Sequence, residues 1–306
     1  MKLINSVVYP LVTPFKKNGE VDSLSISRYV NFLISGGAKM IITTVGTSRF
    51  NLLQNEEIIK VNNKLVESVN RKAFTVCAGP IFGSTNDNLK ILKEVKKDGG
   101  NSYLAIYPER FYEENSIIKY FYKLADSSDI PIFIHQMSLR SGYGGNVSYS
   151  KALISKLMSH ENILGMKEES LDKNLSNWIH KNFSHKKIII GQGGMLNFIK
   201  DSEHGARSYL AGIGSFIPQI EEKFHEYILN NRLNEAIEIK KNFEDPYFNF
   251  AVSLGWHVQL KEILSFKKLM NNYERLPLEP LSKKNSLKLK KFFENSKSIN
   301  LEVEIS

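Results

Sequence analysis

Cysteine is almost absent from the chain, since Cys77 is the single cysteine among 306 residues. An intramolecular disulfide is therefore excluded, and so is a zinc site built from paired cysteines and histidines. So little cysteine is typical of proteins in reducing compartments, and we expect this one to be cytoplasmic.

Long apolar runs are also missing. No segment approaches the roughly 20 consecutive apolar residues that cross a bilayer, and the opening MKLINS lacks the apolar core of a secretion signal. The sequence therefore predicts no membrane partner. Its hydrophobic content of 42% and charged content of 24% are those of an ordinary globular protein.

Acidic residues are outnumbered, with 32 Asp and Glu against 41 Lys and Arg, which gives a net charge of +9. Nucleic-acid-binding proteins have such an excess, but no recognition motif accompanies it here. The densest basic run, 283–291, fits the solvated side of a terminal helix. We therefore expect no nucleic-acid partner, and an attraction of small anionic substrates instead.

The chain does contain a regular alternation of short apolar segments and amphipathic segments. About eight strand–helix units predict the α/β class and a (β/α)8 TIM barrel over 1–243, with 244–306 as an extension of two or three helices. Pro277 and Pro280 form a stiff joint in that extension. The predicted strands are 6–12, 39–45, 73–79, 102–107, 131–135, 163–167, 187–191 and 207–213. The predicted helices are 22–33, 55–69, 86–97, 115–125, 149–158, 171–183, 195–200 and 219–243.

In such barrels the chemistry lies at the carboxyl ends of the strands. This rule selects Thr47 and Ser48, Tyr107, His135, Lys167, Gly191 with Gln192, and the loop 212–215.

Lys167 is the unexpected residue, because it ends an apolar strand. Burying an ammonium group costs several kcal/mol, so this lysine should be paired or have a lowered pKa. A neutral lysine attacks ketones and forms a Schiff base. The alternative is a strand-end lysine whose charged head reaches solvent.

Four motifs in order along the chain resemble the dihydrodipicolinate synthase and N-acetylneuraminate lyase family of pyruvate-dependent Schiff-base enzymes. They are LVTPF with NGEVD at 11–22, GMKE at 165–168, AGIGSFIP at 211–218 and RLPLEPL at 275–281. The resemblance implies that Lys167 is the Schiff-base lysine and that the appended helices belong to the fold. It also implies a homotetramer or a dimer.

The chain departs from the family pattern at two places. The family's Gly-Thr-Thr-Gly-Glu turn is here GTSRF at 46–50. Thr47 and Ser48 can still hydrogen-bond a substrate carboxylate, and Arg49 either adds a charge-assisted bond or points to solvent. The family's Tyr-Asn-x-Pro is replaced by HQMS at 135–138, so His135 is the candidate acid/base, with a locally satisfied buried histidine as the alternative.

Other site predictions follow from the resemblance, from the strand-end rule and from residue spacing. Arg140 is placed to hold a second substrate's carboxylate, or lies in a surface loop. A phenol is available from Tyr107, Tyr112 or Tyr143, while Gly191, Gly212 and Ile213 shape the wall. No metal is predicted, and the histidines expected away from the mouth are His160, His180, His185, His204, His225 and His257.

The sequence therefore predicts a lyase or aldolase that forms or breaks a bond beside a 2-oxo acid, such as pyruvate or a 2-keto-3-deoxy sugar acid. Its partners would be that small anion and an aldehyde, and the imine on Lys167 would make a cofactor unnecessary. The alternatives are dihydrodipicolinate synthase proper, or a divergent barrel without turnover that serves as a binding or regulatory protein.

Overall fold

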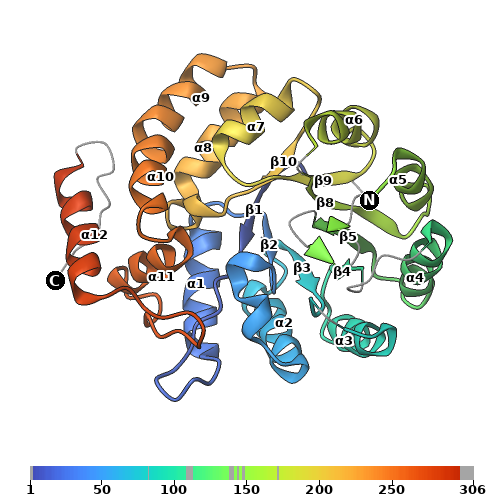
Figure 1. The fold of residues 1–306 in the computed structure, drawn as a ribbon, viewed down its shortest axis with the longest axis horizontal. Coiled ribbons are helices and arrows are strands. Elements are labelled where there is room, and N and C mark those ends of the chain that lie inside the picture. Colours follow the sequence, from blue (N-terminus) through green and yellow to red (C-terminus); the bar gives the residue numbers. More distant parts are fainter. Residues whose placement is uncertain are drawn as a thin grey trace.

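The computed structural model describes residues 3–81, 83–107, 113–137, 141–142, 145–146, 149–170 and 172–296. Among these residues, parallel strands close into a barrel in the order β1-β10-β9-β8-β5-β4-β3-β2 (Figure 1). The predicted (β/α)8 barrel is confirmed. The strands are β1 Val7–Pro10, β2 Met40–Ile42, β3 Phe74–Ala78, β4 Ser102–Ile106, β5 Ile132–Met137, β8 Ile163–Glu169, β9 Ile188–Gly191 and β10 Ser208–Leu210. A separate antiparallel pair is formed by β6 Ser141–Gly142 and β7 Gly145–Asn146.

Helices surround the barrel in chain order, as the ring of coils in Figure 1 shows. They are α1 Ser23–Ser35, α2 Asn55–Val69, α3 Thr85–Lys97, α4 Glu114–Asp126, α5 Lys151–Met158, α6 Lys173–Phe183, α7 Met195–Ser202 and α8 Pro218–Leu229. Side-chain caps fix where several of them begin: Asp22, Ser84, Ser150 and Asp172 accept backbone N–H groups of the first turn. Each such cap stabilises its helix by about 1 kcal/mol.

The predicted helix 219–243 is wrong as a single element. α8 ends at Leu229, and Asn231 adopts a left-handed conformation with φ of 58°. A residue in that region ends helical hydrogen bonding. Helix then resumes as α9 Leu233–Ile239, continues as a π-helical turn at Lys240–Glu244 and runs on into α10 Asp245–Val252. The boundary proposed at 243 therefore falls inside one helical stretch.

The remaining helices, α11 Trp256–Phe266 and α12 Lys283–Asn295, lie with α10 on one side of the barrel, at the left of Figure 1. Arg275 attaches the connection between them to the barrel. Its guanidinium donates to Glu57 at 2.5 and 2.7 Å, and to the carbonyls of Gly19 and Leu52. No helix among the described residues is both long and apolar enough to span a bilayer.

Buried side chains form two layers because neighbouring strand residues face opposite sides. In β5, Phe133 belongs to the cluster inside the barrel, whereas Ile132 and Ile134 belong to the layer against the helices. Cys77 of β3 lies in the outer layer and is fully buried. The inner cluster also includes Val8, Met40, Ile42, Val76, Leu104, Ile190 and Leu210.

Candidate active site

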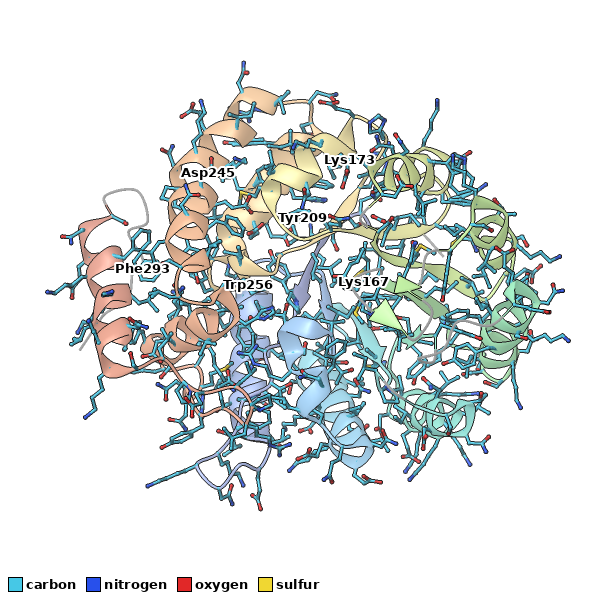
Figure 2. All side chains as sticks on the ribbon, viewed as in Figure 1. Lys167, Lys173, Tyr209, Asp245, Trp256 and Phe293 are labelled. Atoms are coloured by element: carbon cyan, nitrogen blue, oxygen red, sulfur yellow. The ribbon has the colours of Figure 1, made fainter. Side chains whose placement is uncertain are left out.

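A cavity of about 670 Å³ lies beside the carboxyl ends of the strands. Its polar lining comes from the turn after β2, the end of β8, the segment from the end of β9 into α7, and the C-terminal helices. In Figure 2, Lys167 is labelled within the ring of helices, whereas Asp245 and Trp256 belong to helices at its side. The lining residues used below are Gly46, Thr47, Met137, Lys167, Glu169, Gln192, Asn197, Gly212, Ile213, Glu244, Asp245, Phe248, Trp256 and His257.

Lys167 lies on β8 with its side chain 2% exposed, and it lines this cavity. Its strand neighbour on β5 is His135, which is directly opposite it in the parallel register. Gly165 makes this part of the barrel possible, because a Cβ there would lie 1.9 Å from the carbonyl oxygen of Ile188. The ammonium group does not reach open solvent. The sequence predicts that a lysine buried in this way is paired, and the structure shows such a pair.

Glu169 supplies that pairing. It lies two residues after Lys167, so both side chains project from the same face of β8. Its Oε1 forms an ion pair with Nζ of Lys167, and its Oε2 lies 2.7 Å from Nε2 of His135. The same Nε2 is 3.2 Å from Nζ. Burial raises the pKa of the Glu169 carboxyl, but Lys167 and His135 outweigh it and hold that pKa well below its usual value.

The turn after β2 places Thr47 in the cavity wall. Gly46–Ser48 form a short 3₁₀ helix, and the hydroxyl of Thr13 donates to the Ser48 carbonyl at 2.6 Å. Ser48 itself is fully buried and does not line the cavity. Its hydroxyl has no hydrogen-bond partner within the part of the chain that the structure describes. Of the two predicted carboxylate ligands, the structure brings Thr47 to the cavity.

Arg49 takes neither of the two predicted positions. It is 1% exposed, so it does not point to solvent, and it does not line the cavity. Its guanidinium donates to Glu274 at 2.6 Å and to the carbonyls of Thr47 and His257 at 2.7 and 2.9 Å. A buried guanidinium needs such partners, and here they come from the C-terminal segment and from its own turn.

Tyr107 and Gly191 face away from the cavity. The Tyr107 ring packs edge-on against Tyr120 of α4, with centroids 5.5 Å apart. A Cβ on Gly191 would approach His180 of α6 at 3.4 Å. The structure therefore does not bring these two residues to the cavity, because strand alternation directs both positions toward the helix layer.

Gly212 and Ile213 do line the cavity, and they face residues that the sequence did not select. A Cβ on Gly212 would lie 3.5 Å from the Trp256 ring. His257, expected away from the mouth, is in the cavity wall as well. Burial and the nearby Arg49 lower the pKa of His257 to about 4, so this imidazole is neutral at physiological pH.

Glu244 forms the part of the cavity wall that lies between α7 and α10. Its carboxylate accepts the backbone N–H groups of Met195 at 2.6 Å and Leu196 at 3.2 Å, and so caps α7. Burial raises the pKa of this carboxyl, and the two N–H groups oppose that effect.

Three predicted residues, Arg140, Tyr112 and Tyr143, lie outside the described residues. Among those that are described, no group of three or more His, Cys, Asp or Glu side chains could hold a metal ion.

Comparisons with known proteins agree on one family. The sequence model described as "Dihydrodipicolinate synthetase family" matches residues 3–296. The 4-hydroxy-tetrahydrodipicolinate synthase of Karelsulcia muelleri is 27% identical over 293 residues, which covers 94% of this chain and 96% of the relative. Dihydrodipicolinate synthase from Aquifex aeolicus superimposes with a TM-score of 0.85 at 21% identity, over 98% of this chain and 100% of that one. N-acetylneuraminate lyase from Fusobacterium nucleatum gives 0.86 at 17% identity, over 95% and 98%.

Proposed function

The chain belongs to the dihydrodipicolinate synthetase family of pyruvate-dependent lyases and synthases, and we propose that Lys167 forms the Schiff base on which its chemistry depends. The substrate is a 2-oxo acid, either pyruvate or a 2-keto-3-deoxy sugar acid, and the reaction makes or breaks the bond beside its ketone. The resemblance found in the sequence is confirmed by the family match.

The position of Lys167 carries this proposal. It is a buried lysine at the carboxyl end of a barrel strand, it lines the cavity, and the carboxylate of Glu169 lies next to it as an acceptor for its protons. Attack of Nζ on the ketone carbon forms an imine, and the protonated imine accepts the electron pair that is released when the neighbouring bond breaks. No external cofactor is needed for this step.

Thr47 is the proposed partner of the substrate carboxylate, through its hydroxyl, with Ser48 in the same turn. The remaining wall holds Gln192, Asn197 and Asp245, which are hydrogen-bonding groups suited to a hydroxylated chain. These groups support an aldehyde or sugar-acid tail on that side of the cavity. A barrel without turnover would leave the arrangement around Lys167 without a role, so we do not favour that alternative.

Proton transfer in this site is assigned to the pair of His135 and Glu169. Most family members have a tyrosine where this chain has His135, by the resemblance described above. The hydrogen bond of 2.7 Å between the imidazole and the carboxylate, beside Nζ, supports an acid/base role for the pair.

Imine trapping tests the proposal. The protein is incubated with pyruvate and reduced with sodium borohydride, and the modified residue is mapped by peptide mass spectrometry. We expect an adduct on Lys167 that disappears in Lys167→Ala and persists in Lys173→Ala, whose lysine is exposed on α6. Mapping is essential because Lys261 is also buried and burial lowers its pKa to about 7. Absence of an adduct with pyruvate and with longer 2-oxo acids would overturn the proposal.

A cytoplasmic location and assembly into a homotetramer or dimer remain predictions. Sedimentation of the purified protein at several concentrations would test the assembly.

A further inference from the structure

Two oxygen atoms of one carboxylate hold the two nitrogen atoms of the site. Oε1 of Glu169 pairs with Nζ of Lys167, and Oε2 lies 2.7 Å from Nε2 of His135. Glu169 is accordingly the group that connects the lysine to the histidine. Its neighbour Glu168 faces the opposite way and accepts from Ser170 and Ser176.

The hydrogen-bond pattern determines which group can take a proton. An ionised carboxylate only accepts hydrogen bonds, so both of its partners donate. The hydrogen between Glu169 and His135 is therefore assigned to Nε2, from the network. An imidazole nitrogen that already carries hydrogen is not a base, and so the acceptor beside Nζ is the carboxylate of Glu169.

We propose that Glu169 is a catalytic residue that transfers the protons of Lys167 during imine formation and then serves as the counterion of the protonated imine. The inference rests on the proposed function, because it requires the imine on Lys167. His135 holds the second carboxylate oxygen in place and is the donor of the pair.

The step balances without any further reagent. A protonated lysine and a ketone give a protonated imine and one water. Oε1 takes a proton from Nζ, the freed nitrogen pair forms the bond to the ketone carbon, and the carbonyl π pair moves to oxygen. Glu169 returns that proton to the oxygen, and a second proton follows the same path. The oxygen then leaves as water with the electrons of the C–O bond, while the nitrogen pair closes the C=N bond.

The carboxylate ends this sequence ionised, next to a positive nitrogen. An opposite charge within about 4–6 Å favours the charged form of a group, so Glu169 keeps the imine protonated. Only the protonated imine is an effective electron acceptor for the next step. Among the residues that the structure describes, Lys167 and His135 contact the Glu169 carboxylate, and Glu244, Asp245 and His257 line the same cavity.

Single-turnover trapping across pH 5–10 tests this role. In Glu169→Gln we expect adduct formation to slow by about 100-fold or more at neutral pH, because general acid–base transfer contributes that much. The remaining rate should rise with pH, since only solvent can then remove the Nζ proton. The matched control, Glu168→Gln, changes the neighbouring carboxylate that faces away from the site and should keep the wild-type rate and pH profile.

The outcomes separate this inference from the proposed function. If the wild type forms an adduct and Glu169→Gln forms it at the same rate with the same pH profile, the role of Glu169 is wrong and the Schiff base stands. If the wild type forms none, both fall. If Glu169→Gln does not fold by circular dichroism, Glu169→Asp decides. That variant keeps the charge, and we expect a loss of less than about tenfold with a wild-type profile. A profile that rises throughout with pH in Glu169→Asp would contradict the inference.

Discussion

Arg49, at the turn after β2, and Glu274, 225 residues later in the chain, form an ion pair in which both side chains are at most 1% exposed. Lys261 shares the same carboxylate at 3.0 Å. One negative charge thus holds two buried positive charges, and it joins the turn that carries Thr47 to the C-terminal segment.

Removal of that carboxylate charge should be costly. We expect Glu274→Gln to lower the free energy of unfolding by about 3–5 kcal/mol, because it leaves buried cations without their counterion. Urea denaturation measures the change. The matched control is Glu235→Gln, which removes a solvent-exposed pair with Arg232 and should leave the free energy of unfolding nearly unchanged. Equal effects of the two substitutions would contradict this account of the cluster.

Gly165 should resist replacement by alanine. The added Cβ would meet the Ile188 carbonyl at 1.9 Å, where the strand backbones have no room to move. We expect Gly165→Ala to destabilise the protein by about 3 kcal/mol. Gly212→Ala, whose Cβ would find its nearest neighbour at 3.5 Å, should cost less than about 1 kcal/mol. Thermal unfolding of both variants makes the comparison.

Glu221 should make stability fall as pH rises. It is fully buried against Tyr209, and burial, with Glu244 nearby, raises its pKa from 4.5 to about 8. Between these two values the folded state binds more protons than the unfolded state, so the free energy of unfolding decreases with pH. In Glu221→Gln we expect the free energy of unfolding to fall less over this pH range, by on the order of a few kcal/mol. Urea titrations from pH 4.5 to 8 measure the difference. An unchanged slope would show that Glu221 is not the group responsible.

Thr47 should affect substrate affinity more than stability. Loss of a hydrogen bond to a charged group costs about 1.5–3 kcal/mol. We therefore expect Thr47→Val to raise the pyruvate concentration for half-maximal trapping by roughly 10-fold to 100-fold. An unchanged half-saturating concentration would remove Thr47 from the carboxylate site.

Trp256 should limit the size of the second substrate. Its ring lies in the cavity wall next to Gly212. We expect Trp256→Ala to leave imine trapping with pyruvate within about twofold, and to increase turnover of bulkier aldehydes relative to small ones. A panel of aldehydes of increasing length, assayed with pyruvate, provides the test. A uniform loss across the panel would instead indicate damage to the fold.

The sequence predicted the elements well where local signals are strong. The helix 55–69 coincides with α2, since Gln54 and Glu57 form a capping box and Asn70 ends the helix in a left-handed conformation. The strand order of a barrel follows from eight repeats of one unit. The prediction of one helix over 219–243 failed because the left-handed conformation of Asn231 separates α8 from α9, and no proline or glycine beside it marks that break in the sequence.

The site was predicted in part, for a geometric reason. The strand-end rule locates a residue along the barrel axis but not on the inner or outer face. Tyr107 and Lys167 both satisfy the rule, yet alternation sends the tyrosine outward and the lysine inward. Alternation from Lys167 would also have identified Glu169. The contacts of Arg49 and His257 depend on chain closure over about 200 residues, and no local pattern contains that information.

Cys77 gives the chain a built-in reporter of opening. Its thiol is fully buried between the barrel and its helices, and burial raises its pKa to about 12. A thiol this protected reacts with a labelling reagent only when the outer layer separates from the barrel. Because there is no second cysteine, the labelling rate of the unmodified protein measures one event, the exposure of β3. Barrel opening can therefore be measured without an engineered probe.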